Sequence, residues 1–207
     1  MAGGVSGLFF ALASGRAARA KTNPALSVDD IQDLDRVSAS LNDMKTLTGG
    51  FTQIDSRGQL AEGVFFLRRP GQARFEYTKP KTQGAIISDG TWLLVQDSKL
   101  KTAQRYPLSS TPLSILLRKK VDLAGETRIV AVAREPGLLA VTARDDKGIA
   151  QGELTLVFTD PGLELRNWTI KDAQGGRTTV ALRDVRRGVP LNPKLFEIKV
   201  ENIIKPR

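Results

Sequence analysis

The chain has 207 residues, with 31 basic and 22 acidic side chains and a formal net charge of +9. It contains neither cysteine nor histidine. Without cysteine it forms no disulfide and no thiolate metal site, and without histidine it lacks the usual general base and the commonest transition-metal ligand. The length is typical of one domain, and these two absences exclude much catalytic and metal chemistry.

The N-terminus has the pattern of a secretory signal. Residues 5–13 (VSGLFFALA) form a short apolar core, and residues 18–20 (ARA) form a small-x-small cleavage site. The apolar run is too short to span a bilayer. Secretory signals usually carry a basic residue before the apolar run, and none precedes it here. We therefore expect a signal peptide at residues 1–20, cleaved after Ala20, and a single exported domain at residues 21–207.

The first element after this segment is expected to be a helix. Ser27 and Asp30 have the spacing of a capping box, and Asp29 and Asp33 add negative charge near the positive end of the helix dipole. These carboxylates are interpreted as solvated helix-start residues, not as an acid–base pair. The apolar residues that follow recur at helical spacing and define a core-facing stripe: Val28, Ile31, Leu34, Val37, Leu41 and Met44.

From residue 47 onward the sequence is dominated by short strand-like segments separated by turn residues. Connections this short require antiparallel neighbours, because a parallel pair needs a long crossover. About eleven strands in one meander are too many for an open twisted sheet without strong curling, so a barrel or half-barrel is expected. The expected strands are 47–55, 60–68, 72–78, 84–88, 91–97, 100–106, 128–134, 138–144, 152–158, 164–171 and 177–185.

A second, short helix interrupts the strands. Thr111 is placed as its N-cap and Pro112 in its first turn. Apolar residues then circle much of the helix, so it should be buried on more than one side: Leu113, Ile115, Leu116 and Leu117. In a chain of strands, such a segment is most simply a plug or lid across the concave face of the sheet.

The hairpin formed by residues 60–68 and 72–78 carries a surplus of apolar groups. Its first strand is apolar on both faces, whereas its second alternates, with Phe75 and Tyr77 directed inward. Antiparallel sheets normally leave one face solvated, so strands that are apolar on both faces need additional cover. Two explanations stay open: an ordinary filled core, or a cavity for an apolar ligand.

A series of short motifs follows in order along most of the expected domain. It comprises residues 50–53 (GFTQ), 69–71 (RPG), 74–77 (RFEY) with Pro80, 86–92 (IISDGTW), Thr111-Pro112 with Leu116-Leu117, and 191–193 (LNP) with Leu195-Phe196. In order and spacing, these motifs resemble those of the periplasmic outer-membrane lipoprotein carrier family, LolA.

The resemblance implies a mainly β (α+β) fold, an unclosed antiparallel β-barrel of about eleven strands with helices forming a lid over an apolar cavity. It implies a periplasmic chaperone for lipoprotein acyl chains, not an enzyme, with no cofactor. The implied partners are lipoproteins, the inner-membrane ABC transporter that releases them and the outer-membrane receptor that accepts them. We expect a monomer that binds no nucleic acid.

The resemblance also assigns roles to particular residues. In the family, the arginine of the Arg-Pro pair, here Arg69, hydrogen-bonds to the lid and holds the empty cavity shut. The family often has a large apolar residue at the place of Ala73. The candidate residues of the acyl-chain cavity are Val64, Phe66, Phe75, Tyr77, Trp92, Leu94, Leu113, Leu116 and Leu117.

Other classes of protein remain open from the residues alone. Basic clusters at 68–69, 118–120 and 186–187 are compatible with nucleic-acid binding, but the aromatic residues occupy apolar strand positions and form no stacking platform among them. An enzyme would need paired carboxylates or a Ser–Lys pair, and the most conspicuous pair, Asp145-Asp146, falls in a predicted hairpin turn. The main alternative is a secreted basic β-barrel that binds another hydrophobic ligand or an anionic lipid surface.

Overall fold

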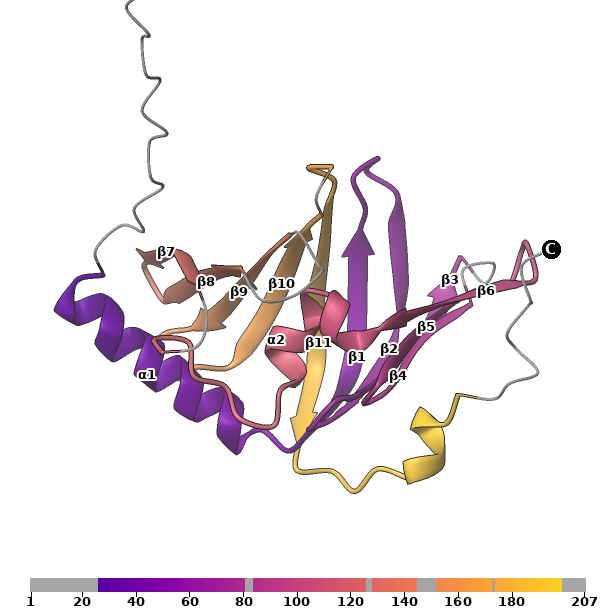
Figure 1. Cartoon of the computed structure of the whole chain (residues 1–207), viewed down its shortest axis with the longest axis horizontal. Helices are drawn as coiled ribbons and strands as arrows, with labels where there is room; N and C mark the ends of the chain where they lie inside the picture. The colour runs from indigo at the N-terminus through magenta and orange to yellow at the C-terminus, as the bar shows by residue number, and fades with distance from the viewer. Residues whose placement is uncertain (1–25, 81–83, 126–127, 145–151, 173, 199–207) are drawn as a thin grey trace, which may run out of the picture.

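The computed structural model of the protein describes residues 26–80, 84–125, 128–144, 152–172 and 174–198 (Figure 1). Its eleven strands form one antiparallel, unclosed sheet, which confirms the expected fold class, and their ends lie within two residues of those expected. The strands are β1 (Thr46–Ile54), β2 (Leu60–Arg68), β3 (Gln72–Lys79), β4 (Ala85–Asp89), β5 (Trp92–Asp97), β6 (Thr102–Pro107), β7 (Arg128–Glu135), β8 (Leu138–Arg144), β9 (Glu153–Thr159), β10 (Leu165–Lys171) and β11 (Arg177–Arg187).

The sheet is a meander whose two halves meet at one junction. The strand order is β6-β5-β4-β3-β2-β1-β11-β10-β9-β8-β7, so each pair except β1–β11 joins strands that are consecutive in the sequence. At the junction, Thr52 of β1 lies opposite Ala181 of β11. Strands β6 and β7 are the two edges, and the sheet curves around the short helix α2 (Leu113–Leu117) without closing (Figure 1).

Helix α1 (Val28–Asp43) begins at the expected capping box. The Ser27 hydroxyl accepts a hydrogen bond from the Asp30 amide at 3.1 Å, and the Asp30 carboxylate accepts one from the Ser27 amide at 3.0 Å. The helix turns Val28 and Ile31, the first two residues of its expected apolar stripe, to solvent. The rest of the stripe is buried against the sheet: Leu34, Val37, Leu41 and Met44.

Three short helical elements occur within the described residues: η2 (Leu108–Ser110), α2 and η3 (Pro193–Phe196). Thr111 is not the N-cap of α2. Pro112 occupies that position, and the Thr111 hydroxyl instead donates to the Leu108 carbonyl of η2 at 2.8 Å. In the part of the chain that the structure describes, no helix is long and apolar enough to cross a membrane.

Different elements cover the two faces of the sheet. Helices α1 and α2 pack on the concave face, where their apolar side chains join strand residues in one continuous core. Helix η3 lies on the convex face, where Arg74 of β3 donates to the Leu195 carbonyl at 3.1 Å and Arg68 of β2 lies over the Phe196 ring at 5.5 Å. The convex face is therefore partly covered as well, which explains why a strand such as β2 is apolar on both sides.

A glycine makes the dense packing of the concave face possible. Gly63 of β2 lies opposite Phe51 of β1. A Cβ atom at this position would lie 2.1 Å from the Glu76 carbonyl oxygen and 2.5 Å from the Phe51 ring. A residue without a side chain is therefore required for the aromatic ring to pack against β2 and β3.

Replacing Gly63 with alanine is expected to destabilise the fold. The new methyl group must displace the Phe51 ring or the β3 backbone, and overpacking of this kind costs about 1–3 kcal/mol. Each kcal/mol corresponds to about 2–4 °C in the unfolding midpoint of a domain of this size. Thermal unfolding followed by circular dichroism measures the change. The control is Gly162→Ala in an exposed turn, where the methyl meets only the Thr159 hydroxyl, at 3.2 Å; equal midpoints would contradict this account.

Candidate functional site

Five of the nine residues predicted to line an apolar cavity lie together on the concave side. Phe75 of β3 and the three lid residues are buried in the same apolar core, and Tyr77 packs against its edge. The three lid residues are Leu113, Leu116 and Leu117. In this position the side chains of α2 and of the strands pack together in one core on the concave side.

Two predicted cavity residues on β2, Val64 and Phe66, face the other way. Phe66 lies opposite Arg74 in register, and Arg74 contacts η3 on the convex face. Val64 shares this face and is 37% exposed. The inward residues of β2 are instead Phe65 and Leu67, which corrects the expected parity of this strand.

The two predicted cavity residues on β5, Trp92 and Leu94, also belong to the convex side. Leu94 is fully buried, but it is aligned with Ile87 of β4, which in turn lies opposite Arg74. Trp92 shares the parity of Leu94, and its ring lies 4.2 Å from the Arg105 guanidinium. These residues are therefore not part of the concave surface.

The aromatic centre of the concave face contains the predicted Phe75 and three rings that the sequence did not predict there: Phe51, Phe65 and Trp168. The Phe75 ring centroid lies 5.5 Å from that of Phe51, 6.2 Å from that of Phe65 and 5.9 Å from that of Trp168. Offset and edge-to-face contacts at such distances are favourable. The signal that could have found Phe65 is the hairpin register, because a turn at residues 69–71 places Phe65 directly opposite the inward Phe75.

Tyr77 adds one polar group to this apolar surface. Its hydroxyl donates to the Gln53 side-chain oxygen at 2.7 Å, and its ring centroid lies 5.2 Å from that of Phe51. Burial raises the pKa of Tyr77 to about 12, and the Gln53 hydrogen bond opposes that shift only in part. The phenol is therefore neutral near physiological pH, and its partner keeps it from being buried unsatisfied.

The lid is held at its C-terminal end by the turn between β2 and β3. The Arg69 guanidinium donates through Nη2 to the Arg118 carbonyl oxygen at 2.5 Å. The Gly71 amide donates to the Leu117 carbonyl oxygen at 2.8 Å. Arg69 thus contacts the end of the lid, which is the geometry that the predicted latch requires.

Arg69 is a buried cation whose hydrogen-bonding capacity is not fully used. The residue is 9% exposed, and its Nε–H has no partner within the described part of the chain. Burial lowers the pKa of the guanidinium, although arginine stays charged near neutral pH. A buried charge with a donor left unpaired is costly. The contact therefore holds the lid less firmly than a fully satisfied one would.

Helix α1 holds the segment that follows the lid. The Asn42 side chain donates to the Val121 carbonyl and accepts from the Val121 amide, both at 2.8 Å. The Ser38 hydroxyl accepts from the Leu123 amide at 3.1 Å. Because Val121 and Leu123 are also buried in the core, the chain after α2 is fixed to α1.

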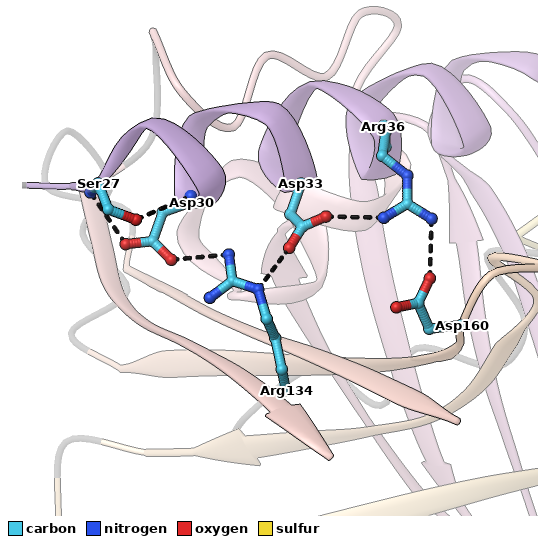
Figure 2. Close-up of polar contacts among 6 residues, drawn as sticks. All are labelled: Ser27, Asp30, Asp33, Arg36, Arg134 and Asp160. Atoms are coloured by element: carbon cyan, nitrogen blue, oxygen red, sulfur yellow. Dashed lines mark hydrogen bonds and ion pairs between the residues drawn. The ribbon is translucent and has the colours of Figure 1, made fainter. Parts of the chain in front are cut away.

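An ionic network fixes α1 to the β7 side of the sheet (Figure 2). Asp33 pairs with Arg134 of β7 and with Arg36, each at 2.7 Å. Arg36 also pairs with Asp160, which follows β9, at 2.7 Å, and Arg134 pairs with Asp30 at 2.9 Å. Asp30 and Asp33 are therefore not simply solvated residues at the helix start, as expected from the sequence. They anchor the helix.

The first of the basic clusters noted in the sequence, residues 68–69, is divided between η3 and the lid. The two side chains point in different directions. The Arg68 guanidinium lies over the Phe196 ring of η3 on the convex face, whereas that of Arg69 donates to the end of the lid. The Asp145-Asp146 pair falls outside the described residues. Among the residues that the structure describes, no group of acidic side chains could hold a metal ion.

The fold and the site together define a class of protein, an open antiparallel barrel whose apolar concave face is covered by a short internal helix. Within that class, the chain belongs to the outer membrane lipoprotein carrier protein LolA family, whose sequence model matches residues 42–199. The matched range contains all eleven strands, α2 and η3. The membership therefore rests on the elements that build the lidded surface.

Individual relatives agree with this assignment. The chain is 30% identical over 172 residues to an outer-membrane lipoprotein carrier protein of Methylococcus capsulatus, covering 78% of this chain and 81% of the relative. It is 29% identical over 161 residues to one of Neisseria meningitidis, covering 74% of each. The crystal structure of a DUF1329 family protein from Desulfovibrio piger shares the fold at a TM-score of 0.51 and 11% identity, covering 82% of this chain and 97% of that one.

Replacing Arg134 with glutamine is expected to loosen α1 at neutral pH and to matter less in acid. Hydrogen bonds from Ser27 and Arg134 hold the pKa of Asp30 below its ordinary value of 3.8. Because the folded state has the lower pKa, this stabilisation is present above that value and is lost as the pH falls through the folded-state pKa. The variant's unfolding midpoint should lie about 1–4 °C below that of the wild type at neutral pH.

Thermal unfolding measured at steps from neutral pH down to about pH 3 follows the difference between the two proteins. Arg186→Gln is the matched control, because it removes the same charge from the exposed end of β11. The difference in unfolding midpoint between the wild type and Arg134→Gln should become smaller as the pH falls. A gap that stays constant across the range, or an equal effect of Arg186→Gln, would contradict an ionic anchor.

Proposed function

We propose that the protein is a periplasmic carrier that buries the acyl chains of lipoproteins. The observation that carries the proposal is the aromatic and aliphatic concave surface under a short lid, in a chain of the LolA family. The relatives in Methylococcus capsulatus and Neisseria meningitidis are named as outer-membrane lipoprotein carrier proteins, which supports the same cargo.

In this proposal the exported domain takes lipoproteins from an inner-membrane ABC transporter and passes them to an outer-membrane receptor. It acts as a monomer, with no cofactor and no catalytic step. Export relies on the signal peptide expected at residues 1–20, which lie outside the described part of the chain. The net charge of +9 adds a modest attraction to anionic lipid headgroups at either membrane.

Carriage is needed because acyl chains do not cross water readily. Each methylene group transferred to water costs about 0.8 kcal/mol, so even one chain leaves a membrane slowly without a protein that buries it. A carrier must also release its cargo. An apolar surface already filled by the lid meets both needs, because loading exchanges one set of apolar contacts for another.

Loading requires the lid to leave the concave face. Leu113, Leu116 and Leu117 would withdraw from the aromatic centre, and acyl chains would take their place beside residues such as Phe65 and Phe75. The contact between Arg69 and the Arg118 carbonyl must break in this step. Hydrogen bonds of a charged group contribute about 1.5–3 kcal/mol, so their re-formation would favour expulsion of the acyl chains on delivery.

The two tryptophans of the chain test which face receives the acyl chain. Trp168 is 2% exposed within the concave core, and Trp92 lies on the convex side against Arg105. A peptide with a brominated acyl chain should quench Trp168 by contact and leave Trp92 unaffected. Quenching should therefore persist in Trp92→Phe and disappear in Trp168→Phe.

The same peptide without an acyl chain serves as the control in a fluorescence titration. Quenching confined to Trp92, or equal quenching by the unacylated peptide, would rule out an acyl-chain site on the concave face. Nucleic acid at moderate salt should not compete with the acylated peptide, because the proposed contacts are apolar.

Replacing Arg69 with leucine is expected to impair the release of cargo more than its capture. The substitution deletes the Arg69 hydrogen bond to the Arg118 carbonyl, which favours the closed lid, and adds apolar surface, so cargo should be held more tightly. A stabilisation of about 1.5–3 kcal/mol lost from the closed state corresponds to a change of roughly tenfold or more in the balance between empty and loaded protein. Uptake of one lipoprotein and its receptor-dependent transfer, compared between wild type and variant, separate the two steps.

Arg68→Leu is the matched control for this experiment. It removes the neighbouring guanidinium, which lies over Phe196 on the convex face and does not touch the lid. It should leave transfer close to the wild-type rate. Normal transfer by Arg69→Leu would contradict the latch role of Arg69, but it would not contradict the proposal that the protein carries acyl chains.

A further inference from the structure

Basic side chains gather at the end of the sheet where the lid is held. Backbone contacts bring four segments of the chain together there. The Lys45 carbonyl accepts from the Arg69 amide at 2.8 Å, and the Thr46 carbonyl accepts from the Gly188 amide at 3.2 Å. The Arg69 guanidinium in turn reaches the Arg118 carbonyl. We call this surface the basic rim, and every charged residue in its four segments is basic: residues 44–46, 68–71, 117–120 and 186–188.

The exposed cations of the basic rim are not neutralised by neighbouring carboxylates. Within the described part of the chain, none of them forms an ion pair: Lys45, Lys119, Lys120, Arg186 and Arg187. Lys45 and Arg187 donate only to backbone carbonyls, those of Asn42 and Leu163. Like charges held together without counter-charges repel one another, so the cluster opposes folding. A cluster of this kind indicates an anionic partner outside the chain.

The turns at the opposite end of the strands have a different charge pattern. Asp55, Asp97 and Asp172 each begin one of these turns, and each carboxylate accepts hydrogen bonds from amides of its own turn. Arg57 in the first turn pairs with Asp55 at 3.3 Å. Positive charge is therefore balanced by carboxylates at that end and unbalanced at the lid end.

We propose that the basic rim docks on anionic phospholipid headgroups and turns the lid end of the protein toward a membrane. This inference rests on the proposed function, because a carrier of acyl chains takes them up and delivers them at membranes. Three of the five exposed cations are lysines, whose flexible stems let each ammonium group bind a separate phosphate. Such side chains suit a layer of mobile headgroups, whereas recognition of one folded acidic protein favours charges fixed in position.

The position of the basic rim gives this docking a direction. Lys119 and Lys120 directly follow Arg118, whose carbonyl accepts from Arg69 at the end of the lid. Headgroups bound to these lysines would therefore contact the chain next to the lid. Each basic residue near an anionic surface adds to the attraction, and salt screens that attraction within about 10 Å. Docking should therefore be reversible and sensitive to salt.

Vesicle sedimentation with the full chain tests the proposal. Vesicles with about 30% phosphatidylglycerol in phosphatidylcholine are compared with vesicles of phosphatidylcholine alone. The acyl chains are the same in both, so the difference in binding measures the effect of headgroup charge. The wild type should bind the anionic vesicles roughly tenfold or more tightly at about 50 mM salt, and most of this preference should disappear at about 500 mM.

Two double variants locate the charge that matters. Lys119→Glu with Lys120→Glu should reduce binding to the anionic vesicles roughly tenfold or more. The matched control is Lys99→Glu with Lys101→Glu, which changes the net charge equally in an exposed turn at the opposite end and should keep most of the preference. Arg186→Glu, at the exposed end of β11, is a second rim variant and should lose part of it. Circular dichroism checks that each variant is folded.

Three results would overturn the proposal. The first is equal binding of the wild type to the two kinds of vesicle. The second is an equal loss in the rim variants and the control, because net charge alone would then explain the binding. The third is binding to soluble polyglutamate without binding to anionic vesicles, which would assign the rim to an acidic protein surface.

The carrier function is measured separately, by quenching of Trp168 with the brominated acyl peptide in the absence of vesicles. This quenching should be the same in Lys119→Glu with Lys120→Glu as in the wild type, which would separate docking from acyl-chain binding. Its absence from the wild type would overturn the carrier function without changing the vesicle result.

Discussion

The β2–β3 turn and the end of helix α2 are joined by one hydrogen-bonded contact, made by a side chain and a backbone amide. Arg69 and Gly71, which flank Pro70, bind the last two carbonyls at the end of α2, and all the apolar packing of the lid lies behind that contact. The Arg69 guanidinium is buried and its Nε–H is unpaired among the described residues. The cost of burying this charge offsets part of the stabilisation that its hydrogen bond provides. In the proposed carrier cycle, the buried and partly unpaired cation makes the closed position of the lid less stable than apolar burial alone would make it.

The two helices on the concave face are held by different interactions: ion pairs and hydrogen bonds hold α1, whereas mainly apolar contacts hold α2. Helix α1 is tied to the sheet by Asp33 and Arg134 and to the chain after the lid by Asn42. Helix α2 is only five residues long, and it is held by apolar contacts and the turn at Gly71. An ionic anchor is insensitive to the arrival of an apolar ligand, whereas apolar contacts are directly exchanged for it. In the proposed loading step, α1 therefore keeps its place on the sheet while α2 moves.

The strands and their order could be predicted because short turns leave an antiparallel chain few alternatives. The direction of the side chains on β2 could not be read from that strand alone, since η3 covers part of the convex face and removes the usual polar alternation. Register with Phe75 would have resolved it. The anchor between Asp33 and Arg134 and the contact of Arg69 with the lid join residues distant in sequence, and no local periodicity encodes such pairs. A role for Arg69 came from family resemblance, and not from the pattern of the sequence.

The arrangement of the strands also has a consequence for folding. Hairpins between consecutive strands build two sub-sheets, β1–β6 and β7–β11, from contacts that are close in sequence. The pair β1–β11 alone joins them, at contacts such as Phe51 with Leu182. Forming this pair closes a loop that spans most of the domain. The entropic cost of closing so long a loop makes this strand pair slower to form than the hairpins. The concave surface does not exist before that step. A chain arrested with its halves unjoined would expose two apolar sheets, and the speed of this single closure sets how long they remain open to aggregation.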